Sequence, residues 1–260
     1  MPAIMPRTAD IAPAGHAAFM MAYSGTFGPT ALHVRALDGT TRVLRERAAT
    51  DDAYVGGGDA GPPINVWPHP ELQLRIGTGG SCEAGVVLGF LRLGPEVRCG
   101  VLQQARGDAV SVAGSAAWFW KPGAGTEWRV GVDVSHHDHR RGEASYAAVG
   151  GAYVTYGDER HAMWLDEPHL RNPSVAIVRK ELRLTVPLAV AIDDPDGSDS
   201  GSTPAIVLGV IPYWTIRARP RGAPDCQDCT TKLEITGFDS TWGLGPVLGL
   251  FWPGWVPRAR

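Results

Sequence analysis

The sequence predicts an all-β protein folded as a single antiparallel up-and-down β-barrel of about twelve strands. Apolar and polar residues alternate with a period of two along most of the chain, and no segment keeps a helical period for more than two turns. The chain of 260 residues contains 33 glycines and 21 prolines, which suit a protein with many turns. Its 44 % apolar and 20 % charged residues are typical of a folded protein and exclude a disordered one.

Thirteen segments alternate in this way and are predicted to be strands. In chain order they are 16–24, 31–37, 41–47, 71–77, 83–89, 96–104, 110–120, 127–135, 145–156, 179–192, 205–218, 232–238 and 243–252, with 161–165 as an additional candidate. Turns such as 38–40 and 77–80 contain the glycines that hairpins need for positive φ. Because no change in composition marks a boundary, residues 1–260 are predicted to form one β domain with flexible ends at 1–15 and 253–260.

The turn at 77–80 predicts a register for the strands around it. Centred on Gly79, it places Arg75 opposite Glu83, and a second turn near 90–91 places Glu83 opposite Arg98. Side chains directly opposite on neighbouring strands contact each other, so the three charged residues should form a row on one face. The same register places Cys82 beside Cys99 on the other face, as candidates for a disulfide.

Other strands repeat this division into a charged face and an aliphatic face. Arg129 and Asp133 alternate with tryptophan and valine in 127–135, and Glu181 and Arg183 alternate with leucine and valine in 179–192. A soluble β-sandwich or lipocalin-like barrel would turn the charged face to water. A barrel in a membrane would turn the aliphatic face to lipid and enclose the charged face. Alternation alone does not separate these two architectures, because both have the same period.

The aromatic residues favour the membrane barrel. When the chain is traced through simple hairpins, they fall at strand ends, and the strand middles hold Val, Leu, Ala and Gly. Tryptophan and tyrosine concentrate at membrane–water interfaces and form girdles around transmembrane barrels. Those predicted at one end are Phe90, Trp118, Phe119, Trp120, Trp128, Tyr153, Tyr156, Phe238 and Trp242, and those at the other end are Tyr146, Phe251 and Trp252.

On these features the chain resembles bacterial outer-membrane β-barrel proteins as a class. The resemblance rests on PELQLRIGTGGSCEAGVVLGFLRLGPEVRCGVL, WRVGVDVS, YAAVGGAYVTYG and the closing WGLGPVLGLFW, and it covers most of residues 71–252. It is a resemblance of pattern, without a diagnostic motif. It implies a place in the bacterial outer membrane, contact with membrane lipid, and a passage or surface role. The chain departs from the class in continuing past Trp252 with PGWVPRAR.

The sequence leaves three hypotheses for the localisation of the protein. The N-terminus has one basic residue and a short apolar run, which does not make a signal peptide. An outer-membrane protein would therefore have lost its export signal, a periplasmic or secreted protein is an alternative, and a chain complete as given would be cytoplasmic. The net charge of −3 argues against a nucleic-acid partner. The sequence does not indicate an oligomeric state.

A second cysteine pair, Cys226 and Cys229, lies in the loop sequence RPRGAPDCQDCTT. A zinc ribbon needs a second such pair, and a redox motif normally begins a helix, whereas a strand is predicted next. A loop disulfide, free thiols and a metal or redox role are the three alternatives.

The segment SHHDHRR, residues 135–141, is the strongest candidate for a metal site. His137 and His139 share a face of an extended chain, and the 166–172 loop, with His169, is expected to open at the same end of the barrel. Three such ligands plus water would make a catalytic zinc site, although the spacing matches no helical zinc motif. The alternative is a polar loop with solvated histidines.

No nucleophile elbow or phosphate-binding loop is present, so no catalytic residue and no cofactor are predicted. The expected function is a structural or passive pore role for small solutes in the outer membrane, and not catalysis. One alternative is a soluble barrel or sandwich that binds a small apolar ligand or a carbohydrate on Trp118, Trp120 and Trp128. A further alternative is a metal-dependent enzyme that uses the cluster His136–His139. In the expected function the lumen is lined by Arg75, Glu83, Arg98, Arg129, Asp133, Glu181 and Arg183.

Overall fold

The computed structural model describes residues 8–24, 31–35, 41–45, 69–89, 92–103, 107–119, 125–138, 145–164, 174–193, 204–226, 234–238 and 242–252. Within them, no helix is long and apolar enough to cross a membrane. The strands are β1 (Ala17–Ser24), β2 (Ala31–Arg35), β3 (Thr41–Arg45), β4 (His69–Gly79), β5 (Cys82–Gly89), β6 (Arg92–Gln103), β7 (Asp108–Phe119), β8 (Thr126–Asp138), β9 (Ser145–Trp164), β10 (Ser174–Thr185), β11 (Leu188–Asp193), β12 (Ala205–Cys226), β13 (Glu234–Phe238) and β14 (Trp242–Trp252).

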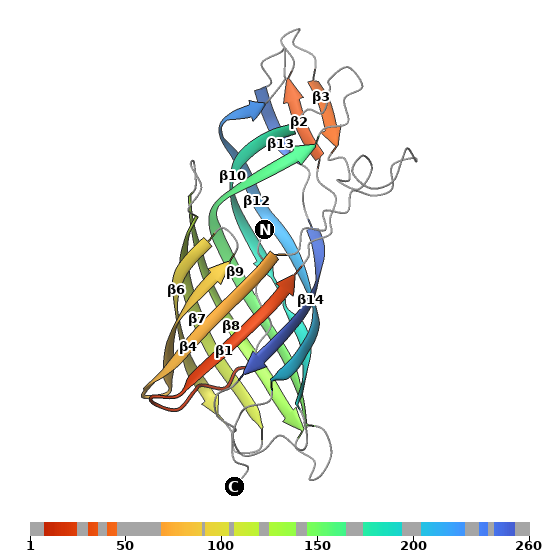
Figure 1. Ribbon diagram of the computed structural model, residues 1–260. Coiled ribbons are helices and arrows are strands. Elements are labelled where there is room, and N and C mark those ends of the chain that lie inside the picture. The colour runs from red at the N-terminus through yellow and green to blue at the C-terminus, as the bar shows by residue number, and fades with distance from the viewer. Residues whose placement is uncertain are drawn as a thin grey trace.

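The main sheet closes into an antiparallel barrel (Figure 1). Its strands follow one another around the ring in chain order, and β14 pairs with β1 to complete it. β10 and β11 occupy one place between β9 and β12, so the barrel has ten strand positions. The predicted all-β up-and-down barrel is confirmed, with ten positions where about twelve were expected. The end at which β1 begins and β14 ends is called the lower end, as it is drawn in Figure 1.

Pro187 divides the strand predicted at 179–192. Proline has no backbone N–H to donate to the ladder, so the strand is interrupted there. The neighbouring strands still bond across the gap. The N–H of Gly151 donates to the carbonyl of Pro187 at 3.0 Å, and the N–H of Val186 donates to the carbonyl of Pro212 at 2.9 Å.

Three of the predicted strands do not belong to the barrel. β2, β3 and β13 form a separate sheet in the order β13-β2-β3, which lies beyond the upper end of the barrel (Figure 1). β9 and β12, with 20 and 22 residues, continue past the rim toward this sheet. The additional strand predicted at 161–165 is the last part of β9.

The glycine turn between β4 and β5 forms as predicted, but its register differs. Gly79, Gly80 and Ser81 have φ angles of 89°, 61° and 64°. An irregularity between Gly77 and Gly79 pairs Gly77 with Glu83. The predicted pairing of Arg75 with Glu83 is therefore wrong by two residues. The predicted pairings of Glu83 with Arg98 and of Cys82 with Cys99 are confirmed.

The barrel keeps charged side chains inside and large apolar side chains outside. Among the described residues, 28 large hydrophobic side chains are exposed, and they come from every one of the ten strand positions. The charged side chains that alternate with them are buried: Glu71, Arg75, Glu83, Glu96, Arg98, Glu127, Arg129, Asp133, Glu181 and Arg183.

One part of the interior is apolar, although the sequence pattern predicts a charged inner face. Small and aliphatic side chains from β1, β9, β11, β12 and β14 form a buried cluster around Met20. Phe251 belongs to it and also faces Arg75, whose guanidinium carbon lies 5.6 Å from the ring centre. Phe251 is thus turned inward, and its predicted place in the outer aromatic girdle is wrong.

Candidate functional site in the barrel interior

Glu83 is the centre of a buried network of charges in the lower half of the barrel. Its Oε1 accepts hydrogen bonds from Arg75 Nη1 at 2.6 Å and from Arg98 Nε at 2.8 Å. Arg75 is not directly opposite Glu83, but it still bonds it, because diagonal neighbours on one face of a sheet lie within reach of a long side chain. Arg98 Nη1 also lies 3.6 Å from Asp133 on β8, so the network joins four strands.

Tyr153 of β9 extends this network, since its hydroxyl donates to Asp133 Oδ1. Its ring lies over Gly131 of β8, where an added Cβ would be 2.3 Å from the ring. Tyr153 is buried, and its predicted place in an outer aromatic girdle is wrong. The alternation in YAAVGGAYVTYG did not show this, because glycines obscure which face is apolar.

Replacing Tyr153 with phenylalanine removes one donor from Asp133 and leaves that carboxylate short of a partner. We expect Tyr153→Phe to lower the free energy of unfolding by about 1–3 kcal/mol, the usual penalty for a buried polar group that loses a hydrogen bond. Tyr156→Phe is the matched control, because Tyr156 lies on the same strand with its side chain exposed. Urea unfolding of both variants measures the difference, and equal losses would contradict the assigned hydrogen bond.

Two similar pairs lie higher in the barrel, on either side of β9. Arg129 bonds Glu127 on β8 at 2.8 Å, and Arg183 bonds Glu181 on β10 at 2.6 Å. Between them, β9 places only Thr155 and Gly157 on the inner face. Arg183 also packs over the ring of Tyr213 at 4.4 Å. A small cavity of about 10 Å³, room for about one water molecule, lies among Gln73, Glu96, Arg129 and Tyr153.

Residues 8–15, which belong to the predicted flexible end at 1–15, run inside the lower end of the barrel. Thr8, Ala9 and Ala12 are buried. Arg98 donates to the carbonyl of Thr8 and, at 2.5 Å, to that of Asp10. The N–H of Ala12 donates to Glu83 Oε2 at 3.1 Å. The segment thus binds the same two residues that form the centre of the charged network.

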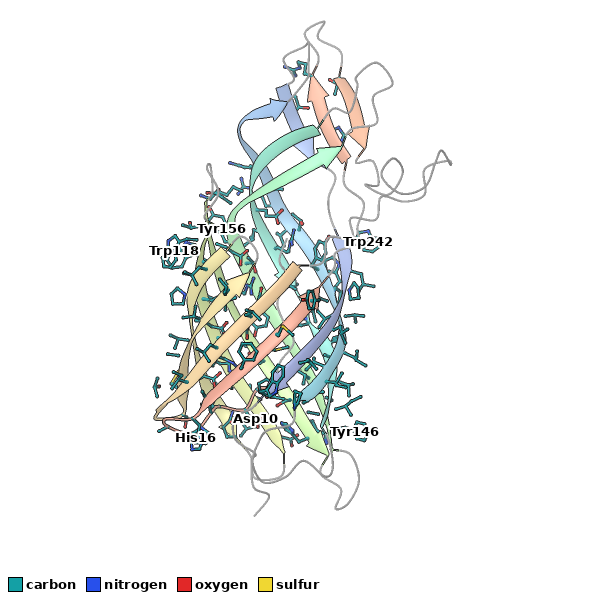
Figure 2. The ribbon with its side chains drawn as sticks, viewed as in Figure 1. Asp10, His16, Trp118, Tyr146, Tyr156 and Trp242 are labelled. Atoms are coloured by element: carbon teal, nitrogen blue, oxygen red, sulfur yellow. A yellow bond between two sulfur atoms is a disulfide. The ribbon has the colours of Figure 1, made fainter. Side chains whose placement is uncertain are left out.

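β8 and the end of β6 bind the other side of this segment. The N–H of Ala9 donates to Ser135 Oγ at 3.0 Å, and Gln103 Nε2 donates to the carbonyl of Ala9 at 3.1 Å. His137 Nε2 lies 2.5 Å from Asp10 Oδ2. Asp10 is shown near the lower end in Figure 2.

The surroundings of Asp10 keep its carboxyl group ionised. Burial raises the pKa of Asp10, but the hydrogen bond to His137 and the charges of His137 and Arg98 outweigh it, so the pKa of Asp10 lies below its usual value of 3.8. The carboxylate of Asp10 therefore stabilises the bound segment at pH values above 3.8. This stabilisation is lost as the pH falls through the lowered pKa of Asp10.

The structure places all seven predicted interior residues on the buried face of their strands. It joins Arg75, Glu83, Arg98 and Asp133 in one network, whereas the other three belong to the two upper pairs, in which Glu127 is the partner of Arg129. The disulfide predicted between Cys82 and Cys99 is confirmed, with Cα atoms 4.1 Å apart. Cys229 and the side chain of Cys226 lie outside the described residues.

The predicted metal cluster is not assembled in the part that the structure describes. His137 bonds Asp10 and His136 bonds Asp108, and no three His, Cys, Asp or Glu side chains of the described residues are grouped as metal ligands. His139 and His169 lie outside those residues. The expectation that their segments open at one end is wrong, because β8 ends at the lower end of the barrel and β9 at the upper end.

Trp118 and Trp128 do not enclose a pocket, since both are exposed on the outer face of the barrel. Trp120, the third residue of that predicted binding platform, lies outside the described residues. Comparison with known protein families and with curated proteins found no match to this chain.

Proposed function

We propose that the chain is an outer-membrane β-barrel protein that spans the lipid bilayer and encloses a polar path for small solutes. The observation that carries the proposal is the inverted polarity of the barrel wall. Side chains such as Val130 and Val132 on β8 are exposed, whereas Arg129 and Asp133 of the same strand are buried. A soluble barrel needs the opposite arrangement, because water solvates charged groups and the apolar face forms the core.

The extent of the apolar outer face supports this proposal. Soluble monomers rarely expose apolar patches larger than a few hundred Å². Here the exposed large hydrophobic side chains surround the whole barrel, since each of the ten strand positions contributes to them. Lipid surrounds such a barrel and covers this surface on all sides, whereas a small protein partner would cover only a part of it.

The exposed aromatic residues support two interface levels. Trp128 lies opposite Tyr156, and Trp214 lies opposite Trp242, in neighbouring strands. Figure 2 shows Trp118, Tyr156 and Trp242 at one level and Tyr146 near the lower end. Trp and Tyr side chains prefer the headgroup region, so these two levels would mark the two surfaces of the bilayer.

The disulfide supports a place in the bacterial envelope, and the lengths of the connections support an orientation there. The disulfide between Cys82 and Cys99 requires an oxidising compartment, and the bacterial periplasm provides one. Outer-membrane barrels have short periplasmic turns and longer outer loops. The strands that end at the lower end are followed by at most 11 residues before the next barrel strand, whereas at the upper end 44 residues separate β1 from β4 and 15 separate β12 from β14. The lower end would then face the periplasm.

A polar path explains why charged groups are buried inside. Removing charges from water is costly unless they are paired, and a wall that served only as a support could be filled with apolar side chains. Instead the interior holds buried charge pairs from β4 to β10, which would line the proposed path.

A second candidate function is binding at the outer surface. A membrane strand tilted by about 45° needs only ~9–11 residues, so roughly half of β9 and of β12 would project beyond the bilayer. The separate sheet of β2, β3 and β13 lies at that end. Binding of intact cells by the chain, lost after removal of 31–45, would support this role.

An arginine in the middle of the outer face tests the membrane location. Val132 lies midway along β8, and we expect Val132→Arg to lower the free energy of unfolding from lipid vesicles by about 2–4 kcal/mol, because a charge at the bilayer centre is poorly solvated. Val101, which is exposed near the lower end of β6, is the matched position. There we expect Val101→Arg to cost about 0–1 kcal/mol.

The dependence on depth distinguishes the two environments. In a soluble barrel both valines face water, so both arginines would have the same small effect. Equal effects at the two positions, or a folded monomer without detergent, would contradict the membrane proposal.

A further inference from the structure

The segment 8–15, called here the inner segment, is held in the barrel by its backbone. Its carbonyls and N–H groups bond Glu83, Arg98, Gln103 and Ser135, and only Asp10 uses its side chain, toward His137. Apart from Asp10 and Ile11, its side chains are small. The inner segment therefore occupies polar groups of the wall, and it joins the strand ladder only at one isolated bridge, between Ala14 and Gly77.

The inner segment is joined to the wall by a turn at Gly15. Gly15 has a φ of 77°, which L-residues with side chains rarely adopt, and β1 begins two residues later. Its N–H donates to the carbonyl of Gly77 at 2.9 Å. The chain thus reverses at the lower rim, from the inside of the barrel into the wall.

Gly77 fits closely against the inner segment. A Cβ at Gly77 would lie 2.1 Å from the carbonyl oxygen of Pro13 and 2.2 Å from that of Ala12, far inside normal contact. The inner segment can lie where it does only because position 77 has no side chain.

We propose that the inner segment is the gate of the polar path, and that the path conducts small cations when this segment leaves. The inference rests on the proposed membrane function. Hydrogen bonds to the inner segment can be exchanged for bonds to water in a hydrated lumen, so its departure leaves the strand ladder intact. Blocking the lower end with a backbone segment closes the path on the periplasmic side.

The charge of the interior determines which solutes the open path favours. Among the described inward-facing side chains, six carboxylates stand against four guanidinium groups, a formal net charge of −2. The carboxylates are Glu71, Glu83, Glu96, Glu127, Asp133 and Glu181, and the guanidinium groups are Arg75, Arg98, Arg129 and Arg183. Rings of acidic side chains select cations in membrane channels, so potassium should pass in preference to chloride.

Gly77→Ala is the test variant and Gly150→Ala its control. The Gly77→Ala methyl group collides with the inner segment, whereas one at Gly150 meets the side chains of Val134 and Leu188 at 3.4 and 3.6 Å and the carbonyl oxygen of Pro187 at 3.8 Å, which are ordinary contacts. Asp10→Ala is a second test variant that changes no strand and removes the contact with His137. Each is compared with the unchanged chain in planar lipid bilayers under a potassium chloride gradient.

A labelling measurement reports the position of the inner segment independently of conductance. Ala9→Cys is added to each variant in a background where Cys226 and Cys229 are alanine, and a maleimide is applied to the folded barrel. Ala9 is fully buried, so its thiol reacts only when the inner segment leaves. We expect labelling about tenfold faster in the Gly77→Ala and Asp10→Ala variants than in the unchanged and Gly150→Ala chains, which corresponds to about 1.4 kcal/mol.

The expected result is faster labelling with increased conductance and a reversal potential on the cation side. Faster labelling without added conductance would overturn the gate, and an anion-side reversal potential would overturn the solute class. Unchanged labelling in both test variants would make the inner segment a fixed part of the wall and would also overturn the gate. Failure of every chain to enter bilayers would refute the proposed membrane function itself.

Discussion

Glu83→Gln is expected to destabilise the barrel more than any other single substitution on its inner face. Glu83 bonds two guanidinium groups and the N–H of Ala12, and its side chain is almost fully buried. Glutamine keeps the shape but loses the charge, so Arg75 and Arg98 remain buried without their shared carboxylate. Breaking a buried ion pair by removing one partner costs about 3–5 kcal/mol.

Urea unfolding of the protein in lipid vesicles measures this loss. Asp108→Asn is the matched control, because Asp108 also bonds a basic partner, His136 at 2.6 Å, but both side chains are at least half exposed. Exposed pairs contribute about 0–1 kcal/mol, so this control should stay close to the unchanged chain. A loss at Glu83 no larger than that at Asp108 would contradict the network.

A double variant separates the ion pair from other effects of the substitution. Arg75→Gln removes one of the charges that Glu83→Gln leaves unpaired, so the two losses should not add. Residues in one salt-bridge network show coupling energies of about 0.5–3 kcal/mol. Strict additivity of the two variants would mean that Arg75 and Glu83 do not act on each other.

The strands of this barrel could be predicted because their two faces differ in chemistry. The alternation in WRVGVDVS places Arg129 and Asp133 on one face and three valines on the other, and the structure keeps that division. The pairing of Cys82 with Cys99 could be predicted because a turn centred between residues 90 and 91 places these two cysteines opposite each other. Local pattern and turn length were sufficient in both cases.

Long-range features were not predictable in the same way. The stretch TADIAPAG has no period and no large apolar residue except Ile11, so nothing in it indicated a segment inside the barrel. Its contacts join residues up to 127 positions apart, such as Asp10 and His137. The clearest signal was Gly77, an inward-facing glycine in a strand whose other inward positions are Glu71, Gln73 and Arg75. A strand glycine often marks the close approach of another backbone.

The remaining differences have local physical causes. The register of β4 against β5 moved by two residues because the chain is irregular at Thr78, which turn composition alone does not show. Tyr153 turns inward, and its ring has room because Gly131 on the neighbouring strand β8 and Gly151 on β9 itself have no side chains. Both effects depend on the residues of the opposite strand, which the pattern of a single segment does not contain.

Removing the disulfide between Cys82 and Cys99 is expected to have the second large effect on stability. The bond joins β5 to β6 across 17 positions of the chain, beside the buried pair of Glu83 and Arg98. A cross-link of this length restricts the unfolded chain and contributes about 3 kcal/mol. We therefore expect Cys82→Ala with Cys99→Ala to lower the free energy of unfolding by about 2–4 kcal/mol.

The comparison is made in a background where Cys226 and Cys229 are alanine, so that no other thiol contributes. Reduction of the parent chain should lower its stability to that of the double variant, which reducing agent should leave unchanged. Cys82→Ala alone should match the double variant in stability, and its Cys99 should react with maleimide after unfolding. The parent chain should not react until it is reduced. Maleimide labelling of Cys82 and Cys99 in the unreduced, unfolded parent would contradict the bond and would remove the argument for an oxidising compartment.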